Sequence, residues 1–200
     1  MRKFFLFLIG MGLMLHDLNA QGFDIRVLRA INVHRNTQFD RPMQAISNSE
    51  YAIGIGTPLL MGSIALINRD SLLWRKSLVL TASVVANTGA TYVLKRIIDR
   101  PRPGVSYPDI QAFEAEKRFS FPSGHTSNAF ATVTSLSLAF KKWYVVVPTF
   151  AWATTVGYSR MHLGMHYPTD VLAGALVGAG SAWLCYQGNR YLQKRRTRKP

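Results

Sequence analysis

The sequence predicts an all-α protein that forms a transmembrane bundle of about five to six helices. Hydrophobic residues make up 48% of its 200 residues and charged residues only 17%, so the chain has enough apolar surface to fold and is not disordered. Five uncharged, mostly apolar stretches of 15 to 19 residues follow one another along the chain, and basic residues occupy the breaks between them. This pattern is typical of helices that cross a bilayer.

Residues 1–20 have the pattern of a secretory signal. Arg2 and Lys3 precede a 12-residue apolar run, Phe4 to Leu15, and small residues come next before Gln21. The run is shorter than the roughly 20 residues of a spanning helix, so we expect a cleaved signal peptide. An uncleaved N-terminal anchor is the alternative, and either one exports the segment that begins at Gln21.

Residues 21–50 form the next expected segment, which we place on the periplasmic side. Between Phe23 and Val33 apolar residues recur at helical spacing, with charged residues between them. This amphipathic helix either packs on the body of the protein or lies in the membrane interface, and the packing interpretation is favoured.

Residues 51–190 are expected to form the helical domain, followed by a basic cytoplasmic tail over residues 191–200. The final stretch carries Gly174, Gly178 and Gly180, which suits close helix packing in lipid. A soluble bundle with very apolar core helices is the alternative, because the stretches are at or below the length of a spanning helix. The five stretches are Tyr51–Asn68, Ser77–Leu94, Thr126–Phe140, Trp143–Ser159 and Val171–Asn189.

The net charge of +14 fits either a nucleic-acid binder or a membrane protein with charged topology signals. If the stretches are spans, the Arg69 break, the Lys141 break and the basic tail share one side. The positive-inside rule makes that side the cytoplasm, and the N-terminal signal predicts the same orientation. We therefore expect a bacterial inner-membrane protein that does not bind nucleic acid. The single cysteine, Cys185, excludes an internal disulfide framework and a cysteine-cluster metal site.

Two groups of polar residues fall on the expected outer face, next to helix ends. Lys95 and Arg102 flank a proline-stiffened turn, where cations suit either a helix C-terminus or a bound phosphate. Further along, Ser123, Gly124 and His125 directly precede an apolar helix. Ser123 can cap that helix, glycine permits close approach of a ligand, and a helix N-terminus offers free N–H groups to an anion. Taken singly, each group also fits a purely structural or topological role.

A third group lies before and within the start of the last apolar stretch. His166 and Asp170 are four residues apart, so the carboxylate can orient the imidazole and leave its other nitrogen as a free lone pair. Arg160, six residues before His166, is near enough to share a phosphate. His162 has no partner at helical spacing, and we expect it in a loop that contacts a headgroup.

Together the groups resemble the signature of the type 2 phosphatidic acid phosphatase (PAP2) superfamily, which includes lipid phosphate phosphatases, soluble bacterial acid phosphatases and vanadium haloperoxidases. The resemblance covers residues 95–170 directly, and the run 51–189 looks like the rest of the fold. The first third of the chain carries no motif. The matching elements are Lys95, six residues and Arg102-Pro103; Pro122-Ser123-Gly124-His125; and Ser159-Arg160, five residues, His166, three residues and Asp170.

The resemblance implies that the phosphoryl group is held without a metal or other cofactor. By that analogy Lys95, Arg102 and Arg160 clamp its nonbridging oxygens, and Ser123 and the Gly124 N–H add hydrogen bonds.

It also implies three catalytic roles. His166 attacks phosphorus to form a phosphohistidine, Asp170 orients His166, and His125 protonates the departing alkoxide and then activates water.

The branch implied is a membrane lipid phosphatase, with phosphatidylglycerol phosphate, undecaprenyl diphosphate, phosphatidic acid or lipid A as possible substrates. A soluble periplasmic acid phosphatase with the same site and a non-catalytic membrane protein that binds anionic lipid are the alternatives. Haloperoxidase chemistry fits the site, but the chain is much smaller than those enzymes usually are. The sequence does not indicate the lipid or the oligomeric state.

Overall fold

The computed structural model describes residues 18–114 and 119–196, and within these ranges all regular structure is helical. This confirms the predicted all-α class. Two short helices, η1 (Thr37–Phe39) and α5 (Pro103–Ser106), accompany six longer ones. The longer helices are α2 (Leu18–Asn32), α3 (Asp40–Ile67), α4 (Ser71–Ile98), α6 (Gly124–Phe140), α7 (Trp143–His162) and α8 (Pro168–Arg196).

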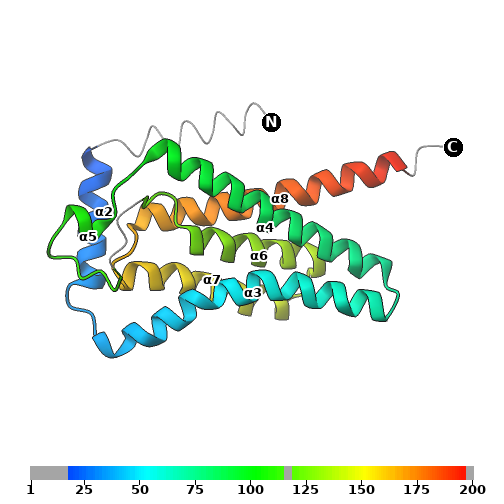
Figure 1. Cartoon of the computed structure of the whole chain (residues 1–200), viewed down its shortest axis with the longest axis horizontal. Coiled ribbons are helices and arrows are strands. Elements are labelled where there is room, and N and C mark those ends of the chain that lie inside the picture. Colours follow the sequence, from blue (N-terminus) through cyan, green and yellow to red (C-terminus); the bar gives the residue numbers. More distant parts are fainter. Residues whose placement is uncertain (1–17, 115–118, 197–200) are drawn as a thin grey trace.

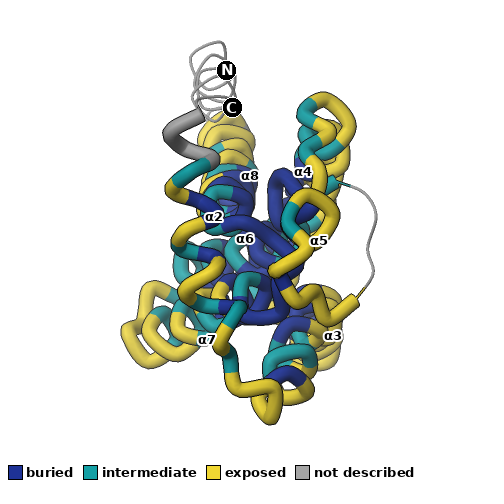
Figure 2. The backbone as a smooth tube through the Cα atoms, turned by 90° about the vertical axis from the view of Figure 1, so that its left-hand side faces the viewer, coloured by how far each residue is buried: buried dark blue, intermediate teal, exposed yellow. Residues whose placement is uncertain are grey.

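Five helices run alongside one another, while α2 lies across the end of the bundle near α5 (Figure 1). Helix α6 is innermost, because it packs against α8, α7, α4 and α3. Seen from the end that carries α2, the buried part of the chain is concentrated around α6 and the exposed faces point outward (Figure 2). Four of the five predicted apolar stretches lie wholly within one helix each, and the first, Tyr51–Asn68, extends one residue past the end of α3.

The loops divide between the two ends of the bundle. Segments 99–114, 119–123 and 163–167 lie at the end with α2, and segments 68–70 and 141–142 lie at the opposite end (Figure 1). At that opposite end, the Asp70 carboxylate accepts hydrogen bonds from two N–H groups in the first turn of α4 and so fixes its start. The residues of all three motif groups are therefore gathered at one end.

The polarity of the bundle is that of a protein in lipid. Large apolar side chains point outward, with Ile67 80% and Trp143 76% exposed, whereas polar side chains such as Asn87 and Ser127 are buried between helices. By length and apolar composition, two segments of the described chain, Thr37–Ile67 and Ser71–Ser106, are candidate membrane spans. Outward apolar and inward polar side chains match helices packed in a bilayer.

Helix α2 packs on the body of the protein, as the favoured interpretation of its amphipathic pattern predicted. Ile25 and Leu28 are buried against Ile110 and Tyr167, while Phe23 stays exposed. Of the predicted signal segment, residues 1–17 lie outside the described residues, and Leu18 to Ala20 begin α2.

Glycines bring α8 against α6. A Cβ atom built on Gly174 would lie 2.6 Å from the carbonyl oxygen of Ser123, and one on Gly178 would lie 2.1 Å from that of Ser127. No side chain fits at these separations. The two glycines thus allow the close approach of α6 and α8, the helices that begin at the end of the bundle where the motif groups lie.

Replacing Gly178 by alanine is therefore expected to destabilise the bundle. The added methyl group forces the backbones apart at a cost of about 1–3 kcal/mol or more, despite the higher helix propensity of alanine. Thermal unfolding in detergent measures the loss. Gly188→Ala in the same helix is the matched control, because nothing lies within 4 Å of its added Cβ. Equal melting temperatures for the two variants would contradict the predicted crowding at Gly178.

Candidate active site

His166 lies in the segment between α7 and α8 and is only 1% exposed. The backbone N–H groups of Met165 and His166 both donate to the carbonyl oxygen of Arg160 at the end of α7, at 2.9 and 3.3 Å. This tight turn brings His166 back to the helix that carries Arg160. The turn therefore fixes the backbone of His166 against the end of α7.

Asp170, in the first turn of α8, faces the Nδ1 side of this imidazole. Its Oδ2 atom lies 3.6 Å from His166 Nδ1 and accepts a hydrogen bond from the Tyr167 N–H at 3.0 Å. The Ser120 hydroxyl donates to the same oxygen and lies 3.4 Å from His166 Nδ1. Since Ser120 and Asp170 occupy the Nδ1 side, Nε2 is the ring nitrogen left for a substrate.

The three predicted clamp cations converge on His166 from different elements. Lys95 comes from the last turn of α4, Arg102 from the residue before α5, and Arg160 from α7. Lys95 and Arg102 are each held by a backbone carbonyl: Lys95 donates to that of Phe119 at 3.0 Å, and Arg102 to that of Met165 at 3.3 Å.

Arg160 is anchored from α3, because its Nη1 donates to the Ser47 hydroxyl at 2.8 Å. It is 1% exposed, so this cation is held inside the bundle. Together with Lys95 and Arg102, it gives this end of the bundle the charge to attract and bind an anion.

The N-terminus of α6 closes the site. Ser123 is the N-cap residue of α6, the position that the sequence allows for it, but its hydroxyl makes no capping hydrogen bond. The hydroxyl instead accepts a hydrogen bond from Thr126 at 2.9 Å. Its N–H donates to the Asp170 carbonyl at 2.9 Å and ties α6 to α8. Gly124 lies beside Lys95, whose Cε would be 3.9 Å from a Cβ at Gly124.

His125 comes next, in the first turn of α6, and is half-buried. The ring of Tyr51 packs edge-on against it, with centroids 5.2 Å apart. The pair brings α3 into contact with the mouth of the site. All eight predicted site residues therefore lie at one end of the bundle, on α4, α6, α7, α8 and the segments that join them.

The family model of the PAP2 superfamily matches residues 76–194 of this chain. The chain belongs to this superfamily. A relative that aligns over 72% of both chains, at 31% identity, is the undecaprenyl-diphosphatase of Bacillus subtilis. The lipid A 4'-phosphatase of Bacteroides thetaiotaomicron is 41% identical over 68 residues, which cover 34% of this chain and 30% of that protein.

The fold agrees with a solved PAP2 structure. The transmembrane PAP2-type phosphatidylglycerolphosphate phosphatase of Bacillus subtilis superposes with a TM-score of 0.79 over 94% of both chains, at 25% identity. This likeness places the PAP2 protein among membrane phosphatases rather than soluble bundles.

Sequence reasoning missed three residues that support the site of this PAP2 protein. Ser120 lies between His166 and Asp170, and Arg100 donates to Asp170 Oδ1 at 2.7 Å. Asp24, on α2, binds Arg100 in turn. Arg100 belongs to the same basic group as Arg102, but nothing in the sequence indicates that Arg100 pairs with Asp170 and Asp24.

The expectation for His162 is wrong. It is the last residue of α7 rather than a loop residue, it is 5% exposed, and its Nε2 lies 3.0 Å from Asp40 Oδ1 at the start of α3. His162 therefore joins α7 to α3 inside the protein and does not face a headgroup.

The surroundings of His166 lower its pKa well below the ordinary histidine value. Burial is the main cause, and the charges of Arg102, Lys95 and Arg160 act in the same direction. His166 is therefore neutral at pH 7 and keeps the lone pair that a nucleophile needs.

This lowered pKa predicts a stability that depends on pH. The unfolded chain binds a proton at its His166 below about pH 6.5, whereas the folded protein does not. The contribution is thus complete above pH 6.5 and is lost as the pH falls, by roughly 1.4 kcal/mol per pH unit down to the folded pKa. Between pH 8 and pH 5 in detergent, the wild type should lose more stability than His166→Gln. Equal losses would contradict the predicted shift.

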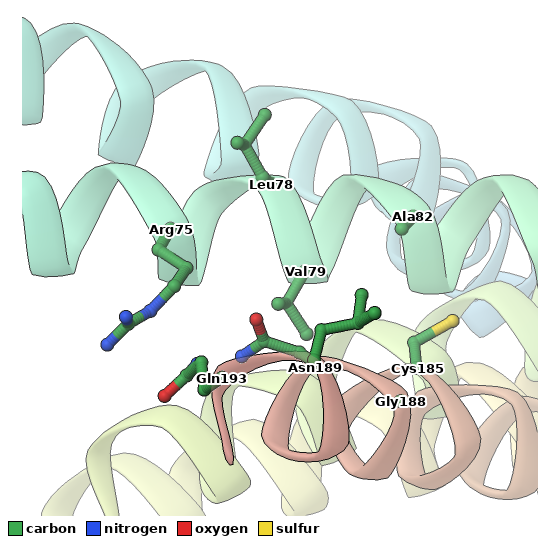
Figure 3. Close-up of a pocket in the computed structure, with 9 residues that line it drawn as sticks. Arg75, Leu78, Val79, Ala82, Cys185, Gly188, Asn189 and Gln193 are labelled. Carbon is green, nitrogen blue, oxygen red and sulfur yellow. The ribbon is translucent and has the colours of Figure 1, made fainter. Parts of the chain in front are cut away.

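A groove of about 660 Å³ between α4 and α8 is separate from the site. Arg75 of α4 and Gln193 of α8 lie on opposite walls at the same end of the groove (Figure 3), toward the end of the bundle opposite His166. None of the eight predicted site residues lines this groove.

Proposed function

We propose that the chain is a metal-independent lipid phosphatase that acts through a phosphohistidine at His166. The observation that carries this proposal is a buried, neutral histidine with a carboxylate on its Nδ1 side and three cations around it. Transfer of a phosphoryl group is the reaction that uses both a nucleophile and several positive charges.

The reaction has two steps. In the first, His166 Nε2 attacks phosphorus, the bond from phosphorus to the leaving oxygen breaks, and His125 gives its proton to that oxygen. In the second, His125 takes a proton from water, the water oxygen bonds to phosphorus, and the phosphorus–nitrogen bond breaks to release phosphate. Asp170 stabilises the positive charge that His166 carries in the intermediate.

The clamp supplies electrostatic stabilisation. Lys95, Arg102 and Arg160 neutralise the nonbridging oxygens, on which charge is spread in the transition state. Ser123 and the Gly124 N–H donate hydrogen bonds to the same oxygens from the N-terminus of α6.

The substrate class is a phosphorylated membrane lipid. Relatives of this chain act on lipid A and undecaprenyl diphosphate, and a structural neighbour acts on phosphatidylglycerolphosphate. These lipids and phosphatidic acid are therefore the substrates to test. The exposed apolar side chains favour a membrane enzyme over a soluble acid phosphatase with the same site.

The proposed location is the bacterial inner membrane, with the site facing the periplasm. Arg69 and the pair Lys141–Lys142 lie at the end opposite the site, which supports a cytoplasmic position for that end. We expect to recover the protein from cells with detergent but not by osmotic shock.

Phosphate release by the detergent-purified protein tests the proposal. We expect turnover of at least one lipid from a panel of phosphatidylglycerol phosphate, undecaprenyl diphosphate, phosphatidic acid and lipid A, with rates unchanged by EDTA. A water-soluble phosphate ester serves as the comparison. Absence of phosphate release from every substrate would overturn the proposal and favour a non-catalytic protein that binds anionic lipid.

A further inference from the structure

A row of three charged residues leads from α2 to the site. The Arg100 guanidinium donates from Nη1 to Asp170 Oδ1 at 2.7 Å and from Nη2 to Asp24 Oδ2 at 2.7 Å. Asp24 belongs to α2, Arg100 to the segment after α4, and Asp170 to the first turn of α8. The row therefore joins three separate parts of the chain.

Both carboxylates are buried, with Asp24 1% exposed and Asp170 fully enclosed. Asp24 also accepts hydrogen bonds from Thr169, from its N–H at 3.0 Å and from its hydroxyl. Buried charges persist only where they are paired and hydrogen-bonded, and this row meets that requirement at each member.

Two further contacts fix the Arg100 side chain. Its Nη1 also donates to the Thr169 hydroxyl at 2.8 Å, and its guanidinium carbon lies 3.9 Å from the centre of the Tyr167 ring. A planar guanidinium held by two carboxylates and an aromatic face has one orientation. The position of Asp170 Oδ1 is set by that orientation.

The charges of the row matter for the reaction. Arg100 with Asp170 alone would be neutral, so the carboxylate would have little net charge to offer His166. Asp24 adds a second negative charge and makes the row −1 overall. The imidazole ring of His166 acquires a positive charge when its nitrogen bonds to phosphorus, so the row has the opposite charge to that ring in the intermediate.

We propose that Asp24 and Arg100 are positioning residues for the reaction, which hold Asp170 against His166 and keep the row negatively charged. Helix α2 thereby supports the active site although it carries no family motif. This inference rests on the proposed phosphatase function.

The row differs from a second tie between α2 and the site end. Arg29, also on α2, pairs with Asp109 at 2.7 Å, and both side chains are nearly half exposed. This pair holds α2 to the segment after α5 but does not reach Asp170. Asp109→Asn therefore loosens α2 without changing the charge near His166, and it is the matched control for Asp24→Asn.

The experiment compares steady-state kinetics of the wild type, Asp24→Asn, Arg100→Lys and Asp109→Asn on the best lipid substrate of the panel. We expect kcat to fall about 10- to 100-fold for Asp24→Asn and Arg100→Lys, with KM changed little because neither residue contacts substrate. Asp109→Asn should keep the kcat of the wild type.

A double variant separates positioning from folding. If Asp24 acts through Asp170, Asp24→Asn should lower kcat far less in an Asp170→Asn background than in the wild type. A merely structural role would lower kcat equally in both backgrounds, and that result would overturn the inference. A kcat equal to that of the wild type in Asp24→Asn or in Arg100→Lys would also overturn the inference.

Failure of the inference is distinguishable from failure of the proposed function. A wild-type protein that releases no phosphate contradicts the proposed function. If the wild type is active and Asp24→Asn has the same kcat, only the positioning role of Asp24 is contradicted. If Asp24→Asn does not fold, Arg100→Lys decides, because it keeps the positive charge and removes the planar fork that orients Asp170.

Discussion

Replacing His166 by alanine is expected to abolish phosphate release, with kcat reduced by about 10⁴-fold or more. The clamp and the α6 N-terminus remain in this variant, so the substrate still binds, but no group is left to accept the phosphoryl. The measurement is phosphate release from the preferred lipid together with substrate binding to the variant.

His34→Ala provides the control, because His34 is exposed and lies outside the site. It should retain wild-type turnover. A labelled phosphoryl group should also become attached to the wild type as an acid-labile adduct that is absent in His166→Ala. Substantial turnover by His166→Ala would show that the proposed nucleophile is wrong.

The fold could be predicted largely because its signal is local. Uncharged apolar runs define helices one at a time, and each of the five runs corresponds to one observed helix, with only Asn68 falling past a helix end. Helix ends could not be predicted in this way, since α3 already begins at Asp40, far before its apolar run. Asp40 is accommodated there by Arg35 and His162, two partners that only the folded chain brings together.

The site could be predicted in part for the same reason. The clamp and the two histidines stand in short motifs, and the structure gathers those motifs at one end. Their supports come from distant segments: Ser120 and Arg100 reach Asp170 across 50 and 70 residues. A buried carboxylate such as Asp24 looks, in sequence, like any charged residue on the polar side of an amphipathic helix.

The role of His125 gives a prediction that depends on the substrate. His125→Ala removes the proton donor for the leaving group, so turnover of a lipid phosphate, whose leaving group is an alkoxide, should fall about 10²–10⁴-fold. Nitrophenyl phosphate releases a stable phenolate that needs no proton. Its first step should therefore survive in the variant far better than that of the lipid.

The second step of the reaction makes this test sharper, because His125 also activates the water. In His125→Ala the phosphohistidine should form from nitrophenyl phosphate and then persist, giving a burst of nitrophenolate equal to the amount of enzyme. The double variant with His166→Ala should show no burst, since it lacks the acceptor. If turnover of both substrates falls equally and no burst appears, His125 is not the acid and base. It would then have another role, for example binding the phosphoryl group. A stoichiometric burst would assign acid and base roles to one histidine and the nucleophilic role to the other.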